Sequence, residues 1–209
     1  MKCNLCPRNC NVDRQIEQGF CKVVKNAVVS RAAPHMWEEP CISGTKGSGT
    51  IFFAGCNLGC RFCQNFDITV KPHGTEVSDE QLAYLMLHLQ GFGVANVNLV
   101  TAAQFVPQVA SAIKIAKEQG LSIPVVYNSG GYERVEALKL LQGLVDVYLP
   151  DLKFCSAELS QNFAAASNYF SVATAAIEEM RRQQPTDEFD GEGYVRRGII
   201  VRHLVLPGH

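Results

Sequence analysis

Short apolar runs alternate with helical segments along most of this chain, and few folds accommodate that order. The runs expected to be strands are residues 50–54, 96–100, 124–127, 145–149 and 198–206. Between them, Ser78 and Gln81 form a capping box that begins a helix, and later helices are expected over residues 109–116, 133–141 and 169–180. Strands separated by helices pair in parallel, and runs that are apolar throughout are typical of strands covered on both faces. The sequence therefore predicts an α/β fold.

Chain length limits how far this sheet can close. Right-handed crossovers would curl the strands into part of a barrel, but an eight-stranded barrel typically needs about 250 residues and this chain has 209. We therefore expect a partial (β/α) barrel that is cut short after its fifth strand, with an apolar edge exposed at residues 199–206. In barrels of this kind the functional residues lie at the C-terminal ends of the strands.

The nine cysteines are unevenly spread and divide the chain into two regions. Residues 1–49 hold many of them and show little regular periodicity, so we interpret this region as a small Cys-rich N-terminal lobe. Residues 50–209 then form the main domain, which is C-terminally incomplete by comparison with a full barrel. Cys41 has no assigned role, and Cys155 is expected to be a small buried apolar residue.

Charge and hydropathy exclude several classes of protein. Nineteen Lys and Arg against 20 Asp and Glu give a net charge of -1, whereas a nucleic-acid binder usually carries a basic excess. The sequence has no apolar run of about 18 residues, so we expect no membrane helix, and its N-terminus has no signal peptide. We therefore expect a cytoplasmic protein whose cysteines serve metal binding or catalysis and not disulfides.

Cys56, Cys60 and Cys63 form a C-x3-C-x2-C group directly after the first expected strand of the main domain. Iron–sulfur clusters usually take four cysteines, so three thiolates would leave one iron of a cubane open to another ligand. A zinc ion completed by a residue from elsewhere is the alternative, because thiolates suit both metals. The spacing alone does not decide between them.

The wider sequence resembles a known family. C-x3-C-x-Phe-C after the first strand of a partial barrel resembles the radical S-adenosylmethionine (SAM) superfamily, and residues 38–65 resemble its pyruvate formate-lyase activating enzyme-like branch. The resemblance covers nearly the whole chain. It implies a [4Fe–4S] cluster on Cys56, Cys60 and Cys63, whose open iron binds SAM. One-electron cleavage of SAM would then generate a 5'-deoxyadenosyl radical that takes a hydrogen atom from the substrate. It also implies an electron donor such as flavodoxin or ferredoxin, and a glycyl radical enzyme as possible protein substrate.

Polar residues at the other strand ends are candidates for binding SAM. The resemblance and the positions together single out Phe62, Asn65, Thr101, Asn128, Ser129, Asp151, Lys153, Arg202 and His203. For most of these, an ordinary turn, a surface ion pair or a core position is the alternative. One segment departs from the family: activating enzymes commonly carry Gly-Gly-Glu after the second strand, and this chain has Thr-Ala-Ala-Gln at residues 101–104.

Four more cysteines, Cys3, Cys6, Cys10 and Cys21, lie within nineteen residues of one another. Four thiolates so close together suit Zn²⁺ or a second iron–sulfur cluster, and unliganded cysteines are the alternative. Together with the departure at residues 101–104, the short barrel leaves a second function open. In that interpretation the chain is a non-catalytic iron–sulfur or metal-binding redox module derived from a truncated radical SAM protein.

Overall fold

Five parallel strands form the centre of the protein in the computed structural model, which describes residues 2–208. They are β2 (Ser48–Phe53), β4 (Val97–Val100), β5 (Val125–Ser129), β6 (Val147–Pro150) and β8 (Val195–Ile199). Neighbours in this series pair in parallel. Every residue of β4, β5 and β6 is buried, which agrees with the uniformly apolar runs. The α/β class predicted from the sequence is confirmed.

Three further strands extend the sheet at its two sides. β1 (Ala27–His35) pairs antiparallel with β2, β3 (Thr75–Val77) pairs with β1, and β7 (Glu188–Phe189) pairs with β8. The order is β3-β1-β2-β4-β5-β6-β8-β7, and the sheet does not close. A partial barrel is therefore confirmed. β1 comes from the predicted N-terminal lobe yet lies in the main sheet; the division at residue 49 stays a prediction.

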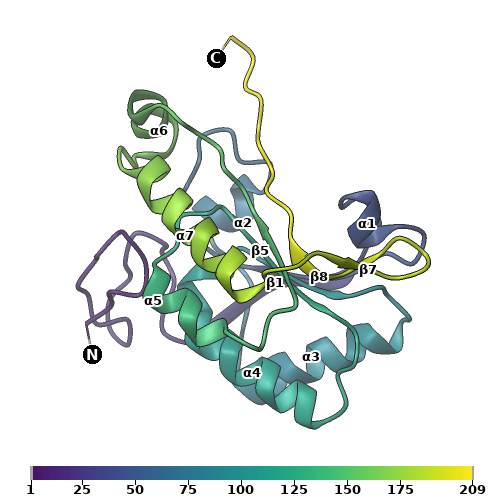
Figure 1. Ribbon diagram of the computed structural model, residues 1–209. Coiled ribbons are helices and arrows are strands. Elements are labelled where there is room, and N and C mark those ends of the chain that lie inside the picture. The colour runs from purple at the N-terminus through teal and green to yellow at the C-terminus, as the bar shows by residue number, and fades with distance from the viewer. Residues whose placement is uncertain (1, 209) are drawn as a thin grey trace.

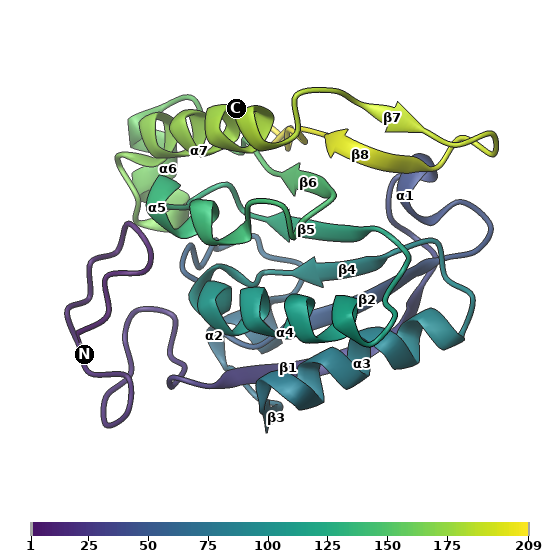
Figure 2. The same ribbon diagram turned by 60° about the horizontal axis from the view of Figure 1, so that its bottom comes forward.

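The long helices pack along one face of this sheet (Figures 1 and 2). They are α3 (Asp79–Gly91), α4 (Val106–Glu118) and α7 (Tyr169–Gln183), with the single turn α5 (Val135–Leu138) between the last two. The capping box that begins α3 forms as predicted, with Ser78 and Gln81 bonding reciprocally. Buried side chains of α3 and α4 then pack on the strands to make the main core.

Shorter helices lie in the connections. α1 (Pro40–Ser43) precedes β2, α2 (Phe66–Val70) follows the cysteine triad, and α6 (Ala157–Ala164) follows β6. A 3₁₀ turn, Ala103–Phe105, lies between β4 and α4. These elements are too short to show a helical repeat, and the sequence did not predict them.

The last predicted strand is wrong in its bounds. We expected a strand over residues 198–206, but β8 ends at Ile199, and beyond it only an isolated bridge joins Arg202 to Asp151. The outer side of β8 is also partly paired, because β7 lies there and Asp187 accepts from the N–H of Ile199. Beyond Arg202 the chain leaves the sheet as an extended segment, yellow in Figure 1, in which Val205 is 77% exposed.

None of the helices in residues 2–208 is long and apolar enough to cross a membrane. The longest helix described, α7, has 15 residues, whereas a bilayer-spanning helix needs about 20. The last turn of α7 also carries Arg181 and Arg182, and burying such charges in a hydrocarbon layer costs free energy.

Candidate functional site

The loop that carries Cys56, Cys60 and Cys63 begins directly after β2. Gly55 and Gly59 have φ angles of +74° and +65°, a left-handed backbone that glycine adopts without strain. The loop turns back so that Cys60 is buried while Cys56 and Cys63 remain half-buried. The two glycines therefore let three thiols from eight residues of sequence share one small region.

Several hydrogen-bond donors point at the sulfurs of this loop, among them the Gly59 N–H at Cys56. The Leu58 N–H donates to Cys56 Sγ at 3.3 Å, and the Thr69 hydroxyl to Cys63 Sγ at 3.6 Å. Such bonds favour thiolate over thiol. Burial acts in the opposite direction and raises the pKa of Cys60 to about 12. The metal-free thiol is therefore protonated, and metal binding would displace that proton.

The three triad cysteines line one cavity of about 700 Å³. Much of its remaining wall comes from the C-terminal ends of the parallel strands. The predicted residues that line it are Phe62, Asn65, Thr101, Asn128, Ser129, Asp151, Lys153, Arg202 and His203. Trp37 also lines the cavity and is 88% exposed, so the cavity opens to the surface beside that ring. The structure thus brings all nine candidates to the triad, and their binding roles stay predictions.

A cubane cluster fits this donor set better than a single metal ion does. Among residues 2–208, no group of three or more His, Cys, Asp and Glu side chains converges closely enough to hold one ion. A cluster takes one thiolate per iron, so its ligands stand further apart than those of zinc. Cys56, Cys60 and Cys63 face one cavity that is large enough for both a cluster and a further ligand. These residues fit a [4Fe–4S] cluster with one iron left open.

A charged network forms part of the cavity wall near the triad. Lys153 Nζ lies 2.6 Å from one carboxylate oxygen of Asp151, and Arg202 Nε donates to the other at 2.9 Å. Arg202 Nη2 also donates to Asn128 Oδ1 at 2.6 Å. The Asp151 and Lys153 side chains are 17% and 18% exposed. Arg202 therefore joins the ends of β5 and β6. It was predicted to lie on the last strand, but it lies beyond the end of β8.

Sequence reasoning missed two acidic residues at this network. Arg202 Nη1 lies 3.5 Å from both Glu38 Oε2 and Glu39 Oε1, and both residues line the cavity. Burial raises the pKa of Glu38. In the described chain Glu39 Oε2 is buried without a hydrogen-bond partner. Both glutamates lie just before α1, far in sequence from the strand ends, and only their position next to Pro40 in the family-like stretch signalled them.

The remaining candidates form the walls of the cavity. The Phe62 ring packs against Phe154 and Phe163 at centroid distances of 5.9 and 5.8 Å, so it shields the triad side from water. Ser129 Oγ accepts from the Gly131 N–H at 3.2 Å, which bends the chain after β5. These contacts give Phe62 and Ser129 structural roles in addition to their places in the cavity lining.

Three candidates have local backbone roles as well. The Asn65 carbonyl accepts from the Thr69 N–H at 3.1 Å at the start of α2. Thr101 has a positive φ of 62°, which is uncommon for a β-branched residue. A ring nitrogen of His203 lies 2.6 Å from the Leu152 carbonyl oxygen. Thr101 is thus held in a strained conformation at the C-terminal end of β4, where the sequence differs from the Gly-Gly-Glu segment of activating enzymes.

Gln104, the last residue of that departing segment, is occupied by the protein itself. Its amide donates to the carbonyls of Ala54, Gly55 and Thr101 at 3.0, 3.0 and 2.8 Å, and the residue is 2% exposed. The side chain therefore fixes the backbone just before Cys56. It does not reach into the cavity as the glutamate of a Gly-Gly-Glu segment would be expected to.

The N-terminal cysteines are near one another but do not form a closed site. Cys6 and Cys21 are buried, and Cys3 and Cys10 are half-buried. Burial raises the pKa of Cys6 to about 12. No metal-holding group of three or more side chains is found in this part of the described chain. A second metal site stays a prediction.

The expectation for Cys155 was wrong, because its side chain is exposed in the turn before α6.

This chain is similar in sequence to a known protein family and to one protein in particular. The model of the radical SAM superfamily matches residues 50–191, a range that contains the triad loop and the ends of β2, β4, β5 and β6. Uncharacterized protein MJ0674 of Methanocaldococcus jannaschii is 33% identical over 214 residues, which cover 99% of this chain and 57% of that protein. This chain thus spans little more than half the length of that relative. The crystal structure of QueE from Escherichia coli aligns with a TM-score of 0.41 and 11% identity, over 86% of this chain and 84% of that one. Because the family model covers well over half of the sequence, this chain belongs to the radical SAM superfamily.

Proposed function

We propose that this chain cleaves SAM reductively and uses the radical so formed to act on a substrate, in the manner of an activating enzyme. One observation carries the proposal. The three thiols that can hold a cluster with an open iron share a single cavity with Asp151, Lys153 and Arg202. Superfamily membership implies a [4Fe–4S] cluster and SAM, and the cavity offers both a place beside the strand ends.

The chain's own residues would bind and orient the cofactor. When bound, the cluster supplies the electron that breaks the sulfonium C–S bond. The Asp151 carboxylate is suited to accept hydrogen bonds from ribose hydroxyls, and Lys153 and Arg202 are suited to bind a carboxylate. Phe62 and its aromatic neighbours keep water from the triad, which protects a reactive intermediate from side reactions.

The finer part of the proposal is the target. A glycyl radical protein is one candidate substrate, because the cavity opens beside exposed Trp37 and Leu204, which is 41% exposed. Exposed apolar side chains at the rim of a site are suited to contact a protein. The electron donor would be a small redox protein such as flavodoxin or ferredoxin. We also propose that the protein works in the cytoplasm, where its nine cysteines would stay reduced.

Cleavage of SAM by the reduced protein tests the central step. Protein reconstituted with iron and sulfide under anaerobic conditions is expected to convert SAM to 5'-deoxyadenosine and methionine in equal amounts when dithionite is added. Both products are measured by chromatography. A reduced cluster that leaves SAM intact would contradict the proposal. 5'-Methylthioadenosine and homoserine lactone in place of these products would point to ordinary non-radical decomposition of SAM.

One observation favours a second candidate, a redox module that assembles a cluster without turnover. The side chain of Gln104 is committed to backbone carbonyls, so the segment after β4 offers fewer ligand groups than the Gly-Gly-Glu segment of activating enzymes. Weak SAM binding would follow. The same assay separates the two functions, because the redox module would show a reducible cluster and no 5'-deoxyadenosine.

Lys153→Met and Asp151→Asn are expected to weaken SAM binding more than they weaken folding. The Asp151–Lys153 pair lies in the cavity wall, and loss of one such pair costs about 1 kcal/mol or less when it is partly solvated. Equilibrium binding of SAM to the reconstituted protein and thermal unfolding of the metal-free protein measure the two effects. Lys46→Met is the matched control, because Lys46 pairs with Glu192 on the surface and does not line the cavity. Unchanged affinity with a large loss of stability would assign the pair a structural role.

The N-terminal cysteines are expected to hold their own metal. We propose that Cys3, Cys6, Cys10 and Cys21 bind Zn²⁺ or a second cluster after a local rearrangement. Their closeness in sequence supports this, as does the burial of Cys6 and Cys21. Elemental analysis of a chain in which the three triad cysteines are Ala measures it directly. Zinc and iron at background level in that variant would eliminate the second site.

A further inference from the structure

One arginine of the N-terminal lobe reaches into the triad loop. The Arg8 guanidinium donates to the carbonyl oxygens of Asn57 at 2.7 Å and Leu58 at 3.0 Å. The same group donates to the carbonyls of Ala164 at 2.7 Å and Ala165. Asn57 and Leu58 stand between Cys56 and Cys60. Arg8 therefore binds the backbone of the cluster loop on one side and the C-terminal end of α6 on the other.

Two aromatic rings hold the guanidinium in this position. Its central carbon lies 3.7 Å from the centroid of the Phe20 ring and 5.2 Å from that of Tyr132. The Phe20 ring also lies against Gly59, where an added Cβ would be 3.3 Å from the ring. The Asn57 amide donates to the Tyr132 carbonyl at 2.6 Å. Arg8 is thus sandwiched by residues that themselves touch the triad loop.

A third contact from the lobe stands at the start of the loop. A Cβ added at Gly55 would lie 2.2 Å from the carbonyl oxygen of Cys21, so the lobe backbone passes directly against the residue that precedes Cys56. The contacts come from residues adjacent in sequence to lobe cysteines. Arg8 lies between Cys6 and Cys10, and Phe20 precedes Cys21.

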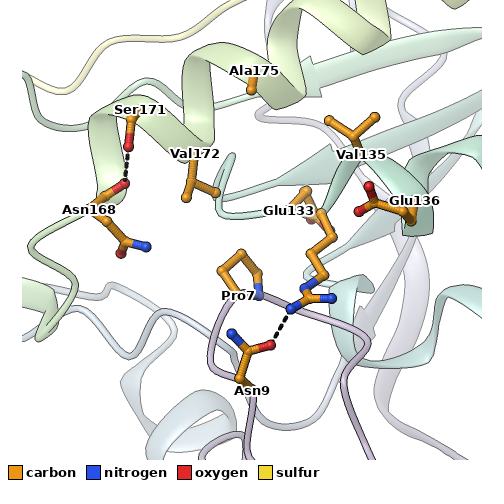
Figure 3. Close-up of a pocket in the computed structure, with 10 residues that line it drawn as sticks. Pro7, Asn9, Glu133, Val135, Glu136, Asn168, Ser171, Val172 and Ala175 are labelled. Carbon is orange, nitrogen blue, oxygen red and sulfur yellow. Dashed lines mark hydrogen bonds between the residues drawn. The ribbon is translucent and has the colours of Figure 1, made fainter.

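Beside this contact the lobe borders an open hollow. It has a volume of about 340 Å³ and lies between the lobe, α5 and α7. Figure 3 shows Pro7 and Asn9 of the lobe on one side of it, and Asn168 and Val172 on the other. One hydrogen bond spans it, from the Arg134 guanidinium to Asn9 Oδ1. Elsewhere the lobe is packed on the main domain, since Cys21 and Val23 belong to the main core and Arg14 donates to the Gln104 carbonyl. What Arg8 adds is a set of charge-assisted bonds made directly to the triad loop.

We propose that Arg8 is a positioning residue for the cluster, and that the N-terminal lobe serves to hold it there. Its guanidinium fixes the carbonyls between Cys56 and Cys60, and so sets the direction in which the two thiols face the cavity. Its positive charge also lies close behind a loop that would carry three thiolates, which favours the more negative, reduced form of the cluster. The proposal rests on superfamily membership and not on SAM cleavage.

Arg8→Gln tests this role, with Arg181→Gln as the matched control. Arg181 likewise donates to two backbone carbonyls, those of Gln184 and Pro185, but at the far end of α7. Clusters are reconstituted anaerobically, and their loss to an iron chelator is followed by absorbance well below the unfolding temperature. Arg8→Gln is expected to speed cluster loss about tenfold or more, since several charge-assisted bonds are removed, while Arg181→Gln leaves the rate unchanged.

Two further measurements separate positioning from folding. Arg8→Gln is expected to lower the reduction potential of the cluster and to alter its electron paramagnetic resonance spectrum, whereas a loss of stability alone would change neither in the protein that remains folded. Arg8→Lys keeps the positive charge but loses the planar set of hydrogen-bond donors. Its reduction potential should therefore be close to that of the unaltered chain, while its cluster is still lost faster. An unchanged rate and potential in Arg8→Gln would overturn the proposal.

Phe20→Leu decides the question if Arg8→Gln does not fold. Phe20 is 40% exposed, so its replacement should leave the fold intact while loosening the guanidinium. Faster cluster loss from folded Phe20→Leu protein supports the proposal. A rate equal to that of the unaltered chain overturns it. Both results are independent of whether the protein cleaves SAM.

Discussion

Replacing any one of Cys56, Cys60 and Cys63 by Ala is expected to abolish the SAM-sensitive cluster. Each thiol would hold a different iron, and two remaining thiolates cannot fix a cubane in a cavity that supplies no fourth cysteine among its lining residues. The expected result is loss of the cluster's absorbance and of the change that SAM causes in its electron paramagnetic resonance spectrum. Iron and sulfide contents, measured on the same samples, give the stoichiometry.

Controls for this experiment come from the other cysteines. Cys155→Ala is the matched control, because Cys155 is exposed and does not line the cavity, and it should keep the full signal. The variants are also made in a chain without the N-terminal group Cys3, Cys6, Cys10 and Cys21, which could bind iron by itself. A SAM-sensitive cluster that survives replacement of the whole triad would show that the assignment is wrong.

The parallel core could be predicted because its signals are local. β4, β5 and β6 are short apolar runs, and α3 begins at a capping box, so neighbouring residues alone identify them. The edge strands could not be predicted in this way. β1 mixes buried Val29 with polar and exposed residues, and two-residue β7 depends on its pairing with β8. The four-residue turn Asp190–Gly193 between β7 and β8, which ends on Gly193 with a φ of +85°, was a hairpin signal that sequence reasoning passed over.

The same distinction holds for the cavity. Asn128, Asp151 and Lys153 follow apolar strands, and parallel strands bring their C-terminal ends to one edge, so topology alone predicts that they meet. Glu38 and Arg8 come from the N-terminal part of the chain, which precedes the alternating strands and helices. Their positions depend on how the N-terminal segment folds back over the sheet, and no periodicity or spacing in the sequence encodes that path.

The buried carboxyl group of Glu133, just after β5, is expected to make the stability of the protein depend strongly on pH. Glu133 is 3% exposed. Burial raises its pKa to about 7, although hydrogen bonds from the Ser129 hydroxyl and, at 3.3 Å, from the Tyr127 hydroxyl act in the opposite direction. Between pH 4.5 and 7 the folded chain therefore keeps a proton that the unfolded chain has lost. Since the folded state binds more protons in this window, the free energy of unfolding falls as pH rises through it. Above pH 7 the carboxyl is ionised in both states, and the free energy of unfolding falls no further on its account.

Glu133→Gln is expected to remove this pH dependence and to stabilise the metal-free protein at alkaline pH. The pKa change from 4.5 to about 7 corresponds to about 3 kcal/mol once the carboxylate is ionised in both states. The stability difference between variant and unaltered chain should therefore increase by roughly 2 to 3 kcal/mol from pH 5 to pH 8. Urea unfolding at the two pH values measures it, and Glu136→Gln is the control, because Glu136 is exposed three residues further along.

The direction of the change is the decisive part of this experiment. The amide that Glu133→Gln introduces would keep an acceptor for the Tyr127 hydroxyl, so packing and hydrogen bonding change little, and any constant cost of the substitution cancels between the two pH values. If Glu133→Gln loses as much stability from pH 5 to pH 8 as the unaltered chain, the Glu133 carboxyl ionises without penalty in the folded protein. In that case it must gain a partner, such as a cation or ordered water, in the hollow that Glu133 lines together with Pro7 and Val172.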